Sequence, residues 1–218
     1  MPRLTRPAPL REGVYEALLE LIITRGLRPG QHLVESDLAA RLGISRQPVR
    51  EALQRLSTEG WVDLRPAHGA FVHTPTEEEA DQLLAVRSLL EAESARLAAT
   101  NATPQAIARL REMCQQGVKA LAADDVDAVV AANASMHSAI VELAGNKVLA
   151  ELAAQVDRRV RWYYTPVARQ RGPESWKEHA ALIDALAEHN GERAAQIMRE
   201  HTEQTRRSYH QRPDREVT

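Results

Sequence analysis

The spacing of apolar residues separates a first stretch that mixes helical and strand patterns from a longer stretch that is helical throughout. Over residues 10–24, apolar side chains recur at helical spacing at Val14, Leu18, Leu21 and Ile22. Residues 61–64 and 70–73 are short β-prone runs, and the turn residues between them predict a hairpin. From Thr76 onward we expect no strand and six antiparallel helices that form a bundle, over residues 76–100, 103–123, 125–144, 147–164, 173–189 and 192–209.

Residues 36–58 have the pattern of two helices joined by a tight turn. Gly43 follows the first helix, where a left-handed cap is needed, and the hydroxyl of Ser45 can cap the second. Arg46 and Arg50 share a solvated face near the start of this second helix. Its apolar stripe consists of Val49, Leu53 and Leu56. Two interpretations stay open: a helix-turn-helix that reads the DNA major groove, or a surface helix with solvated charges.

A break at Thr74-Pro75 divides the chain. Thr76 and Glu79 form a capping-box pattern that opens a long helix. We therefore expect a flexible N-terminal arm over residues 1–9, a winged helix-turn-helix domain over 10–75, an all-helical domain over 76–210 and a frayed tail over 211–218. The fold class predicted is mainly α, with an N-terminal winged helix-turn-helix and a C-terminal antiparallel six-helix bundle.

Composition and charge change this picture only locally. The net charge is −2, but residues 1–75 hold ten Lys and Arg against eight Asp and Glu, so the basic excess falls on the predicted helix-turn-helix. No apolar run approaches the ~18 residues of a membrane span, and the first residues lack the apolar centre of a secretory signal. We therefore expect a cytoplasmic protein without a membrane partner. Cys114 is the single cysteine and is interpreted as a buried, inert thiol.

Three histidines occupy core-like positions in the helical stretch. His137 shares a helix face with Asn133, four residues earlier. His179 and His201 are equidistant from the predicted turn at residues 190–191, so in an antiparallel hairpin both lie ~16 Å from that turn. Three inward imidazoles at compatible heights suggest a metal site. The alternative, three hydrogen-bonded core histidines, stays open at this point.

The first stretch resembles the winged-helix domain of GntR-type bacterial transcription regulators. The resemblance covers about residues 14–72 and rests on LRPG, ESDLAARLGISR, PVREAL and the G-W pair before the wing. It implies a dimer on a pseudo-palindromic double-stranded operator, with recognition-helix arginines on bases and the wing tip in the minor groove. The DNA-binding residues that it implies are Ser45, Arg46, Gln47, Arg50, His68 and Gly69. Ser36 stands where some relatives have an arginine, so one contact is missing.

The remainder resembles the FCD ligand-binding domain of the FadR branch of that family, in its shorter, VanR-like variety with six helices. The resemblance rests on RSLLE, SARLAA, Met136-His137 and LAGN, and on the spacing of His179 and His201. It implies effector binding and dimerisation by this domain, and a divalent metal held by Asp and three His. The matching positions are Asn133, His137, His179 and His201. Because Asn133 is a neutral, weaker ligand than Asp, the site is weakened, and three imidazoles favour Zn²⁺ or Ni²⁺.

Arg87 is the candidate residue for binding the effector. It lies among leucines, one turn before Glu91, and an inward guanidinium can hold a carboxylate through two hydrogen bonds. The alternative is an internal Arg87–Glu91 ion pair. The two interpretations are compatible if this pair forms before the effector binds. A later basic stretch is interpreted as a solvated or interface stripe: Arg158, Arg159, Arg161 and Trp162.

The expected function is a ligand-responsive DNA-binding transcription regulator. We expect a homodimeric repressor that a small organic acid releases from DNA by favouring one spacing of the two winged helices. One alternative is a helical metal-dependent enzyme with an appended DNA-binding domain. The absence of H-E-x-x-H and E-x-x-H motifs argues against it, so we expect no enzyme activity. The other alternative is a DNA-binding protein with an inert dimerisation bundle.

Overall fold

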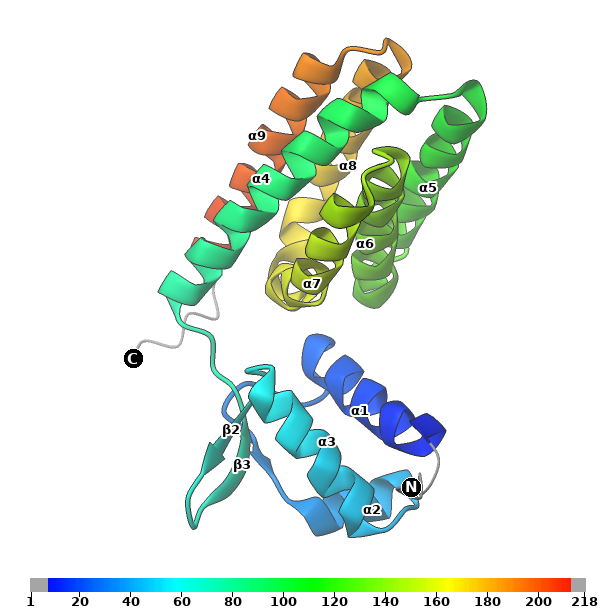
Figure 1. The fold of residues 1–218 in the computed structure, drawn as a ribbon. Helices are drawn as coiled ribbons and strands as arrows, with labels where there is room; N and C mark the ends of the chain where they lie inside the picture. The colour runs from blue at the N-terminus through cyan, green and yellow to red at the C-terminus, as the bar shows by residue number, and fades with distance from the viewer. Residues whose placement is uncertain (1–7, 213–218) are drawn as a thin grey trace, which may run out of the picture. The chain divides into compact units, whose positions relative to one another are not determined.

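The structure, a computed structural model, describes residues 8–212, and the chain divides between Pro75 and Thr76 into two units (Figure 1). Residues 1–7 and 213–218 lie outside the described residues, and with them most of the predicted arm and tail. The fold is mainly α, with strands only in the first unit among the described residues. No helix in residues 8–212 is both long enough and apolar enough to cross a membrane.

The first unit combines helices with one small antiparallel sheet. Its helices are α1 (Ala8–Ile23), α2 (Glu35–Leu42) and α3 (Arg46–Thr58), and its strands are β1 (His32–Leu33), β2 (Val62–Arg65) and β3 (Gly69–Val72). The predicted hairpin is confirmed: β2 pairs with β3 from Val62↔Val72 to Arg65↔Gly69. β1 was not predicted, because two residues cannot show a period; it adds to β3, giving the order β1-β3-β2.

Apolar burial explains how α3 is held. The predicted stripe of Val49, Leu53 and Leu56 is buried, and α3 packs against α1. Gly43 ends α2 in the left-handed conformation, with φ of 67°, as predicted. The prediction for the Ser45 hydroxyl is wrong in one respect. Ser45 occupies the N-cap position of α3, but its side chain makes no capping hydrogen bond, and its hydroxyl is exposed to solvent.

The second unit contains six α-helices. They are α4 (Glu77–Asn101), α5 (Pro104–Ala122), α6 (Val126–Leu143), α7 (Lys147–Tyr164), α8 (Ala168–Ala187) and α9 (Gly191–His210), with a 3₁₀ turn, η1 (Thr165–Val167), before α8. α8 begins five residues earlier than predicted, because Pro173 lies inside it. A proline there removes one backbone hydrogen bond, while burial of Ala168, Arg171 and Gly172 holds the preceding turn in place.

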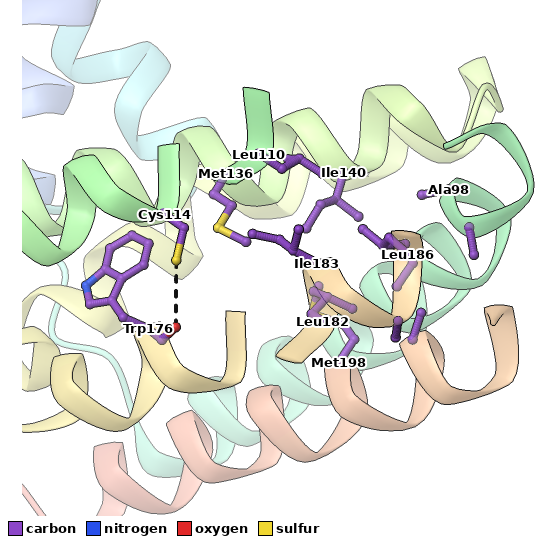
Figure 2. Packing of buried hydrophobic residues seen from close by; sticks show 14 residues of the cluster. Ala98, Leu110, Cys114, Met136, Ile140, Trp176, Leu182, Ile183, Leu186 and Met198 are labelled. Carbon is purple, nitrogen blue, oxygen red and sulfur yellow. Dashed lines mark hydrogen bonds between the residues drawn. The ribbon is translucent and has the colours of Figure 1, made fainter. Parts of the chain in front are cut away.

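The main core of this unit lies among α4, α5, α6, α8 and α9 (Figure 2). At one end of it the indole of Trp176 packs over Gly117. The Sγ atom of Cys114 donates a hydrogen bond to the carbonyl of Trp176 at 3.7 Å. Burial raises the pKa of the Cys114 thiol, which agrees with the interpretation of an inert core residue.

Polar contacts stabilise the start of α4 and connect it with the end of α9. The capping box is confirmed: the Thr76 hydroxyl accepts from the Glu79 N–H at 3.1 Å, and the Glu79 carboxylate accepts from the Thr76 N–H at 2.7 Å. His210 contacts Glu77 and Asp81 on the first turns of α4. Arg212 was assigned to the frayed tail, but its guanidinium pairs with Glu77 at 2.9 Å, so order extends to this residue.

Candidate functional site

The two arginines at the start of α3 lie together on the surface of the first unit. Their side chains are 63% and 49% exposed, and both contact Glu35 at the start of α2. Arg50 donates to both carboxylate oxygens of Glu35 at 2.8 Å, and Arg46 donates to one of them at 3.2 Å. Arg50, more than Arg46, lowers the pKa of Glu35. The sequence reasoning missed Glu35, since its partners are 11 and 15 residues away.

A depression of about 660 Å³ extends from these arginines to the β2–β3 hairpin. Gly69 lines it with φ of +93°, a conformation that favours glycine, and His68 lies beside Gly69 in the turn. Gln47 is exposed and donates to Glu51 at 2.9 Å. The residues implied for DNA contact therefore fall on α3 and on the hairpin tip of the same unit.

The three histidines meet in the interior of the second unit. His137 comes from α6, His179 from α8 and His201 from α9, and each is at least 97% buried. One nitrogen from each ring lies within 4.8 Å of the others. The Nε2 atoms of His137 and His179 are 3.2 Å apart. Burial, more than the neighbouring charges, lowers the pKa of His179 and of His201 well below the ordinary value, so both rings are neutral and can offer a lone pair.

A carboxylate lies beside Nδ1 in two of these rings, those of His137 and His201. Glu178 Oε2 lies 2.8 Å from His201 Nδ1, and Glu91 Oε2 lies 3.0 Å from His137 Nδ1, although the second contact is poorly aligned for a hydrogen bond. A histidine whose Nδ1 faces a carboxylate presents Nε2 to a metal, which is the usual support of a histidine ligand. Burial raises the pKa of Glu91 but Arg87 and His137 outweigh it, leaving a pKa of about 2. The sequence reasoning did not single out Glu178, and it paired Glu91 with Arg87 alone.

Asn133 lies one turn before His137 on α6 and is 4% exposed. Its Oδ1 atom is buried without a hydrogen-bond partner, and so is the Nδ1 atom of His179. An unpartnered buried oxygen is costly, and a cation beside it removes that cost. Three imidazoles and one amide oxygen therefore fit a divalent metal.

Arg87 lies beside this centre, and its side chain is 2% exposed. Its Nε donates to Glu91 at 3.0 Å, so the expected internal pair is present. Its Nη2 lies 3.4 Å from His137 Nε2, while Nη1 is buried without a partner. A cavity of about 500 Å³ opens next to Arg87, Glu91 and His137, between α4, α6 and α7.

The basic stretch on α7 is not a solvated stripe throughout. Trp162 is fully buried, because it belongs to the inner face of the helix, and Arg158 lines the cavity. Beyond the histidines, Arg171 from α8 is also buried and donates to the carbonyl of His201 at 3.3 Å. Tyr164 and Ser175 lie in the same polar interior, and burial raises the pKa of Tyr164. The sequence reasoning singled out none of these three residues.

Comparison with known proteins identifies both units. The family of bacterial regulatory proteins named gntR matches residues 10–72, and the FCD domain matches residues 82–204. The HTH-type transcriptional repressor RspR of Escherichia coli (strain K12) is 26% identical over 208 residues, which cover 93% of this chain and 90% of that protein.

Solved structures agree over the same extent. McbR/YncC of E. coli superimposes with a TM-score of 0.80 at 26% identity, covering 93% of this chain and 97% of its own. A GntR transcriptional regulator from Rhodococcus sp. RHA1 has a TM-score of 0.80 at 27% identity, covering 94% and 99%. The relatives matched by sequence and by structure are transcriptional regulators.

Proposed function

The chain belongs to the GntR family of bacterial regulatory proteins that carry an FCD domain, and we propose that it is a homodimeric repressor released from its operator by a small carboxylate. DNA binding and transcription regulation follow from the family. The observation that carries the finer proposal is Arg87: a buried guanidinium with one unpartnered nitrogen, beside three histidines and a cavity. A regulator of this kind acts where the chromosome lies, so the proposal places it in the cytoplasm.

Arg46 and Arg50 are proposed to contact the operator, with Ser45, Gln47, His68 and Gly69 around them. Both arginines are exposed and preordered by Glu35. One arginine bonded to a guanine through two N–H groups contributes about 1–3 kcal/mol of discrimination. Arg50→Ala should therefore weaken operator binding by about 5- to 150-fold in a fluorescence-anisotropy titration.

Arg193→Ala is the matched control, because this substitution removes the same charge from an exposed position on α9, in the other unit. Its operator affinity should stay within twofold of the wild type. Equal affinities for Arg50→Ala and Arg193→Ala would contradict the assignment of the recognition surface.

The proposed metal ligands are Asn133, His137, His179 and His201. Zn²⁺ or Ni²⁺ held there would supply a Lewis acid for an effector carboxylate. Arg87 would orient that carboxylate, while Glu91 and Glu178 hold the imidazoles by their Nδ1 atoms. The cavity beside Arg87 is large enough for a small organic acid.

Elemental analysis of untagged protein tests the metal. We expect one Zn²⁺ or Ni²⁺ per chain, and a lower melting temperature after chelation, since a ligand of the folded state stabilises it. His179→Ala should lose the metal, whereas His68→Ala, an exposed histidine of the first unit, should keep it. Absence of a stoichiometric metal in the wild type would contradict the proposed cofactor.

The proposed dimer contact involves α4 and α7, which pack against each other. Each exposes two large apolar side chains on one face: Val86 and Leu89 on α4, Val148 and Leu152 on α7. Leu89 is 73% exposed, so Leu89→Glu should leave the fold intact but shift the protein toward monomer in analytical ultracentrifugation. Val118→Glu, on α5, is the control at 47% exposure. A dimer unaffected by Leu89→Glu would place the contact elsewhere.

Release from the operator is tested with a panel of small organic acids. Each acid is titrated into the complex of protein and operator, and dissociation of the protein from DNA is followed by fluorescence anisotropy. An acid that binds the helical unit but leaves DNA affinity unchanged would contradict the proposed regulation, since coupling requires unequal affinity for the two states. An Arg87→Ala protein should bind DNA normally and lose the response.

A further inference from the structure

The cavity beside Arg87 has an uneven distribution of charge. Its lining includes two guanidinium groups, those of Arg87 and Arg158, and four carboxyl groups, those of Glu91, Glu142, Glu151 and Asp157. Arg87 and Glu91 come from α4, whereas the other three carboxyl groups and Arg158 come from α6 and α7, so this second wall carries three carboxyl groups against one guanidinium.

The inner end attracts an anion. Arg87 is buried, its Nη1 has no partner, and His137 of the proposed metal centre lines the same cavity. Glu91 is already engaged by Arg87 Nε and lies against His137 Nδ1. A carboxylate placed at this end meets the free guanidinium nitrogen and, under the proposed function, the metal.

The outer end attracts a cation. Glu142 on α6 and Glu151 on α7 are exposed, and Asp157 lies half-buried on α7. Burial and the charge of Glu91 raise the pKa of Asp157, although Arg87, Arg161 and His137 oppose them. Burial is the first of these causes, so a negative charge on Asp157 is costly. A second carboxylate on the ligand would add to this repulsion, whereas a protonated amine would relieve it.

We propose that the effector is a zwitterion, a monocarboxylate whose far end carries a protonated amine that faces Asp157, Glu142 and Glu151. This rests on the proposed function, because it assumes that the carboxylate of the effector binds at Arg87. It adds the charge at the other end of the molecule, which selects an amino acid of the ω-amino type over a dicarboxylate.

The test uses four acids with one carbon skeleton: 5-aminopentanoate, 5-hydroxypentanoate, pentanoate and glutarate. Binding to the full-length protein, with its metal as purified, is measured by isothermal titration calorimetry. We expect 5-aminopentanoate to bind at least tenfold more tightly than glutarate, and more tightly than the hydroxy acid. Asp157→Asn should reduce the ratio of the two dissociation constants to threefold or less.

Asp184→Asn is the matched control, since this substitution removes the same charge from a residue outside the cavity lining. Asp184 lies on α8 and pairs with Arg111 on the surface. It should keep the tenfold ratio. If Asp157→Asn does not fold, Glu142→Gln, an exposed member of the same wall, should reduce the ratio instead.

The outcomes separate the two proposals. Binding of glutarate or 5-hydroxypentanoate as tightly as 5-aminopentanoate overturns the zwitterion and leaves the carboxylate effector in place. The zwitterion is also overturned if neither Asp157→Asn nor Glu142→Gln changes the ratio of the dissociation constants of glutarate and 5-aminopentanoate. Failure of all four acids to bind, at concentrations where Arg87→Ala and wild type give the same blank heats, overturns the carboxylate effector together with this inference.

Discussion

Gly117 on α5 is the position where a single methyl group should disturb the core and the histidine centre together. An alanine Cβ built there lies 2.0 Å from Cζ2 of Trp176. The indole is 3% exposed, and its ring packs edge-on against the ring of His179 at a centroid distance of 4.9 Å. Gly117→Ala must therefore move the indole, the α5 backbone or both, and the indole can retreat only toward other buried groups.

The magnitude follows from this overlap. Unbonded carbon atoms pack at about 3.5–4.0 Å, so the ring or the helix must move by about 1.5 Å. Overpacking of a core costs about 1–3 kcal/mol, and alanine returns about 1 kcal/mol as the better helix former. Because the overlap is large and involves a rigid ring, we take the upper end of the cost. The expected loss of unfolding free energy is about 2 kcal/mol, about a 30-fold change in the equilibrium constant.

The assay is urea unfolding followed by far-ultraviolet circular dichroism, with Zn²⁺ affinity measured by chelator competition. Gly13→Ala is the matched control, because nothing lies within 4 Å of a Cβ added at this position of α1. It should stabilise the protein by about 0.5–1 kcal/mol through the helix backbone alone. Gly117→Ala should also weaken Zn²⁺ binding, since Trp176 supports His179, whereas Gly13→Ala should not.

A Gly117→Ala protein as stable as Gly13→Ala would refute the packing argument. Destabilisation with unchanged Zn²⁺ affinity would refute only the link from Trp176 to His179. The two measurements thus separate the core contact from its effect on the centre.

Three further predictions concern other contacts. Asn133→Asp should tighten Zn²⁺ binding at least tenfold in chelator competition, because it adds a charge beside the proposed metal; unchanged affinity would mean that residue 133 is not a ligand. Thr76→Ala should lower the unfolding free energy by about 1 kcal/mol in urea, since it removes the side-chain bond of a capping box; an unchanged midpoint would show that the cap is dispensable. The hydrogen bond from His210, and then that from Arg206, lowers the pKa of Asp81 below 3.8. The lowered pKa means that ionised Asp81 stabilises the folded state above pH 3.8, and this contribution is lost as the pH falls through the folded-state pKa. Asp81→Asn should therefore be less stable than the wild type at pH 7, and the difference in unfolding free energy should shrink in acid. A constant difference across urea curves from pH 7 to about pH 3 would contradict that reasoning.

Predictions from the sequence succeed where the partners are close in the chain. Thr76 and Glu79 are one turn apart, so their reciprocal hydrogen bonds follow from helix geometry alone. The distant pair His179 and His201 was also found, because an antiparallel hairpin brings together residues equidistant from its turn. Their ring centroids are 4.6 Å apart.

The failures have physical causes as well. Glu178 precedes His179 in the chain, yet it serves His201, 23 residues away, and no periodic pattern encodes that pairing. Glu35 binds the α3 arginines across a turn for the same reason. Trp162 was misplaced because three arginines precede it closely in the sequence, although on a helix neighbours in sequence point to different faces. The partners of charged residues depend on the tertiary structure, so sequence patterns predicted that the three histidines meet but not which carboxylates lie beside them.

Under the proposed function, the amide of Asn133 has a thermodynamic consequence for the regulator as a whole. With an aspartate there, the protein itself would supply a negative charge to the buried centre; with the amide, that charge has to arrive from outside. Metal and carboxylate would then be linked ligands, each raising the affinity of the other by the same factor. Occupancy of the centre would then depend on the concentrations of both the metal and the carboxylate, and the apparent affinity for the effector would rise or fall with the concentration of the metal.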